Sequence, residues 1–121
     1  MYNYTTGKTM QEEVPMVITD IKVRKLFDDG PMKAIVSVTF DDQLVLHDIK
    51  VISVRGKNFI VMPSRKKADG SYRDIVHPIN AEFRGILEEE VLRAFEEEQA
   101  RSAAEAEIEA LESGDYAGQP I

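Results

Sequence analysis

The sequence contains no cysteine and no tryptophan. The lack of cysteine excludes a disulfide framework, a thiolate metal site and a cysteine nucleophile. No run of about 18 or more apolar residues occurs, so no membrane-spanning helix is expected. The first ten residues also hold no apolar segment of the signal-peptide kind. These absences predict a cytoplasmic protein, and a length of 121 residues suits one small domain with its own core.

Positive charge is scarce in the chain as a whole, which has a formal net charge of −7. Such a balance by itself argues against a polyanionic partner. The charges are unevenly distributed, however, because residues 16–80 hold eleven Lys or Arg and eight Asp, whereas residues 81–121 hold three Arg and twelve acidic residues. The central segment therefore has a small basic excess, and an anionic partner is compatible with that segment.

Residues 16–40 alternate between apolar and polar side chains, as half-buried β-strands do. The first strand is expected to direct one set of side chains towards a core: Val17, Thr19, Ile21 and Val23. After the turn signal at residues 28–31, a second strand repeats the alternation with Met32, Ala34, Val36, Val38 and Phe40. Because a short loop joins the two segments, we expect them to pair as an antiparallel hairpin.

Three further segments have the character of strands. Residues 44–54 include apolar side chains at both odd and even positions, which favours a central strand covered on both faces. A turn leads to a strand at residues 59–62, and residues 71–76 form a last short strand. With the helix described next, the sequence predicts an α+β fold, in which an antiparallel β-sheet meander of four to five strands precedes a C-terminal helix packed on it.

The hydrophobic period changes to that of a helix after Pro78. Asn80 is a favourable N-cap residue. One apolar stripe then recurs at intervals of three or four residues: Phe83, Ile86, Leu87, Val91 and Phe95. The glutamate runs of this helix are either a solvated face or a competitor for the basic loops.

Along the whole chain we expect a flexible extension at residues 1–15, a domain at 16–99, and an acidic helical extension with a disordered tail at 100–121.

Only two histidines are present, and each has a carboxylate neighbour in the sequence. His47 and Asp48 point to opposite faces of a strand, and so do Asp74 and His77 unless the chain bends. Neither pair can therefore form directly, as a carboxylate-oriented general base would require. Both histidines are interpreted as structural, hydrogen-bonded residues. No enzyme, catalytic residue, metal site, cofactor or small-molecule substrate is predicted.

Basic residues are most concentrated in "MPSRKKADGSYRDIVHPIN", which runs from Met62 to Asn80. Its candidate binding residues are four cations: Arg65, Lys66, Lys67 and Arg73. A turn centred on an Asp-Gly pair brings Arg73 back towards the other three. Such cations are too costly to desolvate without partners, so they are expected to be solvated or paired. The segment is either a solubilising hairpin tip or a site for a polyanion, whose phosphates need accessible Lys and Arg.

This segment, together with "DGPMKAIVSVTFDDQLVLHDIKVI" (Asp29 to Ile52), resembles the SpoVG family, named after stage V sporulation protein G. The resemblance covers about Met16 to Phe95 and leaves out residues 1–15 and those after Gln99. It implies a small bacterial cytosolic regulator with a β-sheet and a C-terminal helix, which forms a homodimer. It also implies binding to DNA and, in some members, to RNA.

The resemblance further implies that the protein affects gene expression, sporulation or septation, and that it is not an enzyme. The basic positions of the family correspond to Arg65 and Lys66, with Lys67 and Arg73 as weaker candidates. The function expected is that of a nucleic-acid-binding regulator that acts through this basic segment. The alternative is a protein–protein interaction module that acts on the division or transcription machinery without touching nucleic acid. No membrane partner is expected.

Overall fold

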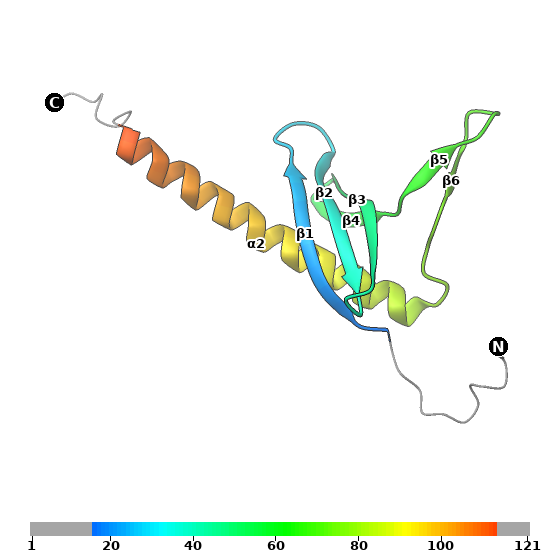
Figure 1. Cartoon of the computed structure of the whole chain (residues 1–121). Helices are drawn as coiled ribbons and strands as arrows, with labels where there is room; N and C mark the ends of the chain where they lie inside the picture. The colour runs from blue at the N-terminus through cyan, green and yellow to red at the C-terminus, as the bar shows by residue number, and fades with distance from the viewer. Residues whose placement is uncertain (1–15, 114–121) are drawn as a thin grey trace.

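The computed structural model describes residues 16–113, which form a four-stranded antiparallel sheet, a two-stranded hairpin and one long helix (Figure 1). The sheet consists of β1 (Ile18–Leu26), β2 (Met32–Phe40), β3 (Leu44–Val54) and β4 (Lys57–Val61), paired in chain order. The hairpin consists of β5 (Ser64–Lys66) and β6 (Tyr72–Asp74), and the helix is α2 (Ala81–Ser113). The predicted α+β fold, a meander followed by a C-terminal helix, is confirmed. The predicted extension 1–15 and the end of the predicted tail, 114–121, lie outside the described residues.

Left-handed backbone conformations make the turns between the sheet strands tight. Asp41 and Asp42 have φ values of 52° and 53° in the β2–β3 turn. Aspartate tolerates this conformation better than most residues that carry a side chain. Arg55 and Gly56 have φ values of 54° and 80° in the β3–β4 turn. Positive φ at both central residues is typical of two-residue hairpin turns, whose twist matches that of the strands.

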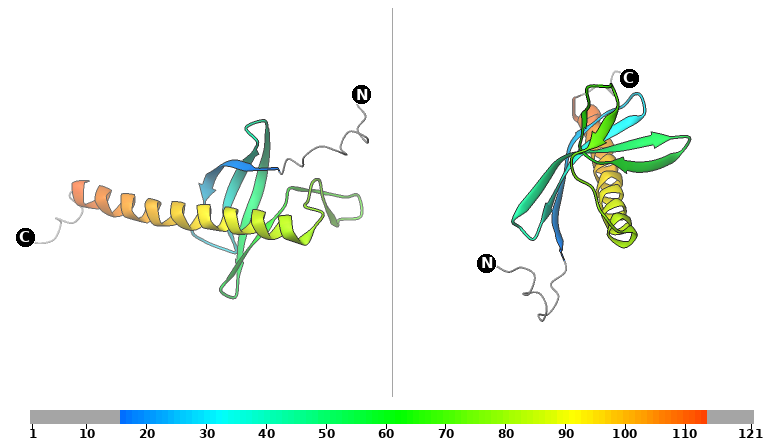
Figure 2. Two further views of the ribbon diagram at one scale, coloured as in Figure 1. Left: turned by 90° about the horizontal axis from the view of Figure 1, so that it is seen from below. Right: turned by 90° about the vertical axis from the view of Figure 1, so that its right-hand side faces the viewer.

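The helix covers one face of the sheet and extends beyond it (Figure 2). The inner residues predicted for β2 are largely correct, since Ala34, Val36 and Val38 are fully buried. They pack in one core with the helix residues Leu87, Val91 and Phe95 and with other strand residues. This burial of a strand face against a helix stripe is what holds the two layers together.

The helix begins as the sequence predicts. The Oδ1 atom of Asn80 accepts a hydrogen bond from the backbone N–H of Phe83 at 2.7 Å, which satisfies one of the free donors of the first turn. Ile86, however, is 45% exposed, so its predicted place in the buried stripe is wrong. It lies about 140° around the helix from Val91, because five residues advance a helix by about 500°.

A β-bulge changes the predicted inner face of β1, and a second bulge interrupts the pairing of β2 with β3. The pairing of β1 with β2 shifts between Ile18 and Asp20, so Ile18 packs against the core while Val17 and Thr19 are exposed. The pairing of β2 with β3 shifts after Val36, and Asp48 adopts a φ of 66° there. An extra residue in one strand reverses the face of every side chain beyond it.

The central position of β3 is confirmed, but its predicted cover on both faces is not found. Val45 and Val54 are 42% and 44% exposed, because the helix covers only one side of the sheet. Leu44 pairs with Phe40 on the helix side and is 57% exposed, because it lines an open hollow there. The predicted last strand at residues 71–76 is shortened to β6, and it pairs with β5 instead of joining the main sheet. The meander proper therefore has four strands.

Candidate functional site

The basic segment forms the hairpin of β5 and β6, which projects away from the sheet and the helix (Figure 1). We refer to residues 64–74 as the basic hairpin. Arg65 pairs with Arg73, and Lys66 pairs with Tyr72, in an antiparallel register. Lys67 follows at the start of the turn, where its backbone N–H donates to the carbonyl of Ser71 at 2.7 Å. The predicted approach of Arg73 to the other cations is confirmed.

The turn of the basic hairpin is built by Asp69, Gly70 and Ser71. Gly70 has a φ of 92°, which a residue with a side chain rarely adopts. The Oδ1 atom of Asp69 accepts hydrogen bonds from the hydroxyl of Ser71 at 2.7 Å and from its backbone N–H at 3.0 Å. These bonds hold the pKa of Asp69 below its ordinary value, the hydroxyl bond contributing most. Asp69 is therefore engaged in the turn itself.

The four cations of the basic hairpin are exposed and have no partner within the described residues. Arg65, Lys66, Lys67 and Arg73 all have exposed side chains. Within residues 16–113, none of the four takes part in a salt bridge or a side-chain hydrogen bond. The only acidic groups on the hairpin are Asp69 in the turn and Asp74 at its base. The hairpin tip thus holds an unneutralised positive charge.

Three cations of β1 are placed differently. Arg24 donates from Nε to the hydroxyl of the buried residue Ser37 at 3.1 Å. Lys22 lies 3.4 Å from a carboxylate oxygen of Asp20, and Lys25 lies over an aromatic ring with its Nζ atom 5.1 Å from the ring centroid. These side chains already have local partners. Compared with these three cations, the basic hairpin is the clearer site for an external anion.

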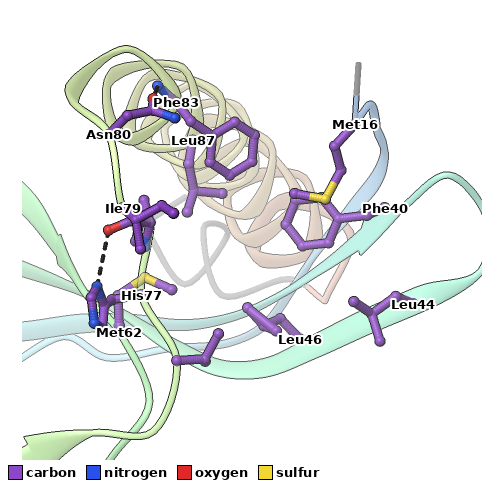
Figure 3. Close-up of a pocket in the computed structure, with 12 residues that line it drawn as sticks. Met16, Phe40, Leu44, Leu46, Met62, His77, Ile79, Asn80, Phe83 and Leu87 are labelled. Carbon is purple, nitrogen blue, oxygen red and sulfur yellow. Dashed lines mark hydrogen bonds between the residues drawn. The ribbon is translucent and has the colours of Figure 1, made fainter. Parts of the chain in front are cut away.

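The two histidines make separate hydrogen bonds, as expected of structural residues. The Nδ1 atom of His47 lies 2.9 Å from the hydroxyl of Ser37, across the β2–β3 bulge. The Nδ1 atom of His77 donates to the carbonyl of Pro78 at 2.9 Å (Figure 3). No hydrogen bond joins His77 to Asp74 within the described chain, although both line one shallow hollow. Residues 16–113 also contain no cluster of three or more potential metal ligands.

An apolar hollow lies where the sheet meets the start of the helix, and no sequence pattern predicted it. It has a volume of about 490 Å³, and Figure 3 shows the side chains around it. Phe40, Leu44 and Leu46 line it from the strands, and Phe83 and Leu87 line it from the helix. The residues that line the hollow come from segments far apart in the chain, so no local sequence pattern could have identified it.

Ile79 lies at the edge of this hollow and is 88% exposed. An isoleucine so exposed, beside a concave apolar surface, is a feature of surfaces that contact other molecules. Its position between the basic hairpin and the helix was visible in the sequence, but its exposure was not.

No helix of the described part is long and apolar enough to cross a membrane.

Comparison with known proteins identifies the family of the chain. The SpoVG family model matches residues 16–97. A protein of Clostridioides difficile named "Putative septation protein SpoVG" is 58% identical over 82 residues, which cover 68% of this chain and 89% of that protein. A protein of the same name from a Thermoanaerobacter species is 50% identical over 92 residues, 76% of this chain and 100% of that protein. The match includes all six strands and the first half of the helix, and the chain belongs to the SpoVG family.

Proposed function

We propose that the protein is a nucleic-acid-binding regulator that contacts phosphate groups through the basic hairpin. The observation that carries this proposal is the group of four exposed cations that lack partners among the described residues: Arg65, Lys66, Lys67 and Arg73. Phosphate oxygens are the natural partners of such side chains, and arginine adds the geometry of a bidentate contact.

The register of the hairpin strengthens this argument. Arg65 lies directly opposite Arg73, and like charges at opposed positions of a ladder destabilise it. An anion bound between the two guanidinium groups would remove the repulsion. The hairpin therefore has the charge arrangement of a site that is completed by an anionic ligand.

Such a site would bind with modest sequence specificity, because phosphate contacts carry no direct base information. The names of the relatives support a role in septation, and we extend this to the control of gene expression, including sporulation genes, in the cytoplasm. We further propose that two copies associate. A homodimer would present two hairpins to one nucleic acid and raise the effective concentration of the second contact.

The direct test is the affinity of the purified protein for DNA and RNA of mixed sequence. We expect the double variant Arg65→Ala/Lys66→Ala to bind both more weakly and with a smaller salt dependence than the wild type. An unchanged affinity would overturn the role of the hairpin. Selection from a random nucleic-acid pool, performed at a stated salt concentration, would then identify the preferred target and the preference for DNA or RNA.

A second candidate function is a protein–protein interaction module that acts on the division or transcription machinery. The observation that favours it is the apolar hollow beside Ile79, which is open to solvent. In that case Ile79→Ser would abolish capture of the protein partner, whereas Arg65→Ala/Lys66→Ala would leave capture intact. The opposite pattern, with binding lost only in the hairpin variant, would favour the nucleic-acid function. Neither candidate requires catalysis.

A further inference from the structure

The two faces of the basic hairpin carry different side chains. Residues directly opposite each other on a ladder share a face, and successive residues alternate between faces. Arg65 and Arg73 therefore lie on one face, whereas Lys66 and Tyr72 lie on the other. Asp74, two residues beyond Tyr72 and opposite Ser64, shares the face of Tyr72. The hairpin is thus a strip with two chemically distinct sides.

The charges of these two faces indicate different roles. The first face carries two arginines and, if the alternation continues past the strand end, Lys67. The second face carries one cation, Lys66, and one carboxylate, Asp74, which offset each other. A phosphate group is attracted more strongly to the first face, because a carboxylate offsets the one cation of the second. Beside the phosphate that Lys66 contacts, the second face therefore also suits a neutral part of a nucleic acid.

Tyr72 is the main feature of that second face. Its side chain is 67% exposed, although an aromatic residue gains considerable stability from burial. It does not belong to the hydrophobic core or to the residues packed against it. It lines a shallow hollow of about 390 Å³ together with Arg73, Asp74 and His77. An aromatic ring thus stands in solvent beside unpaired cations and hydrogen-bonding groups.

We propose that Tyr72 stacks on an unpaired base of a single-stranded nucleic acid whose phosphates lie along Arg65 and Arg73. This inference rests on the proposed function of the hairpin and deepens it. Exposed aromatic side chains next to a cationic track are the usual means of binding single strands, because every base offers a π-face. A base inside a duplex has both faces covered by its neighbours and cannot stack on Tyr72 unless it is extruded.

Asp74 is placed to contact the edge of the same base. Its carboxylate lies on the face of Tyr72 and lines the same hollow. Carboxylates accept hydrogen bonds from the amino groups of bases. Bases that carry an amino group are therefore expected to bind better than thymine or uracil at this position.

The test compares Tyr72→Ala with the matched control Tyr72→Phe, which keeps the ring and removes only the hydroxyl. The probes are a short single-stranded oligonucleotide of mixed sequence and the duplex of the same sequence, at one salt concentration. Tyr72→Ala should lower the affinity for the single strand by about 5- to 160-fold, the range for loss of one base–aromatic stack. Its affinity for the duplex and its salt dependence should match those of the wild type, and Tyr72→Phe should bind both probes normally.

Three results would overturn the stacking role: no loss of single-strand affinity in Tyr72→Ala, an equal loss for both probes, or an equal loss in Tyr72→Phe. A different result would refute the proposed phosphate binding by the hairpin: Arg65→Ala/Lys66→Ala would then bind both probes as the wild type does. Because Tyr72 is exposed and lies outside the core, misfolding of its variants is not expected. A circular dichroism spectrum of each variant checks this directly.

Discussion

Removing two of the four hairpin cations should reduce the salt dependence of nucleic-acid binding by about half. The variant is Arg65→Ala/Lys66→Ala, which leaves Lys67 and Arg73 in place. All four side chains are exposed, and none is paired within residues 16–113. Each is therefore free to release one condensed counterion from the nucleic acid when it meets a phosphate.

The magnitude follows from the number of contacts. For duplex DNA the slope of log affinity against log salt is about −0.9 for each phosphate neutralised. Four contacts then give a slope of about −3.6, and two contacts give about −1.8. When the salt concentration rises about fourfold, the wild type should lose about 150-fold in affinity and the variant about 12-fold. A dimer that engages both hairpins doubles both slopes and keeps their ratio.

The assay is a series of fluorescence-anisotropy titrations of labelled duplex DNA at several salt concentrations. A matched control is Arg93→Ala/Arg101→Ala, which removes the same amount of charge from the helix. Those two arginines form salt bridges with glutamates three and four residues away, so they are already neutralised. Both double variants are two charges more negative than the wild type, whose formal net charge is −7.

The control should keep the wild-type slope, with at most a small uniform loss of affinity from the added negative charge. A control variant whose slope falls as far as that of the hairpin variant would refute the reasoning, because overall charge would then explain the effect. An unaltered slope in Arg65→Ala/Lys66→Ala would refute it as well, because the hairpin would then make no phosphate contact.

Three further predictions concern the fold. Leu87→Ala, at a residue 1% exposed, should lower the free energy of unfolding by about 2–5 kcal/mol in urea denaturation, whereas Ile86→Ala, at 45% exposed, should change it by about 0.5 kcal/mol; equal effects would contradict the assigned helix face. Asn80→Ala should cost about 1 kcal/mol by the same assay, and Asn80→Asp should cost much less, since the cap bond is kept. The folded-state pKa of Asp69 is lowered, so the turn keeps its stabilising bonds above the ordinary pKa of 3.8 and loses them as the pH falls through the lowered value. The amide NMR signal of Ser71 should therefore titrate with a midpoint below 3.8, and a midpoint above it would contradict the hydrogen bonds.

The features that the sequence predicted correctly depend on neighbours within one segment. The inner face of β2 follows from strict alternation, and Ala34, Val36 and Val38 are buried as expected. The cap at Asn80 follows from the preference of a short polar side chain for the first turn of a helix. The basic hairpin follows from an Asp-Gly turn between two short strands.

Two errors in the strands arise because alternation is counted along the chain, whereas the faces are set by strand pairing and by the layer that covers them. The bulge between Ile18 and Asp20 exchanged the inner and outer residues at the start of β1. Exposure of Val45 and Val54 in β3 reflects a single covering layer, whereas apolar residues at both odd and even positions predicted two. Neither the bulge nor the single covering layer can be recognised from the local sequence pattern.

The sequence by itself determined the fold class, the order of the strands, the start of the helix and the presence of a cationic turn, because propensity, period and turn chemistry are local properties. Only the tertiary structure decided that Arg65 faces Arg73, that Tyr72 stands in solvent on the other side of the same hairpin, and that an apolar hollow opens beside Ile79. These features depend on strand register and on which surfaces the core leaves uncovered. Both are fixed by contacts between residues that are distant in the chain.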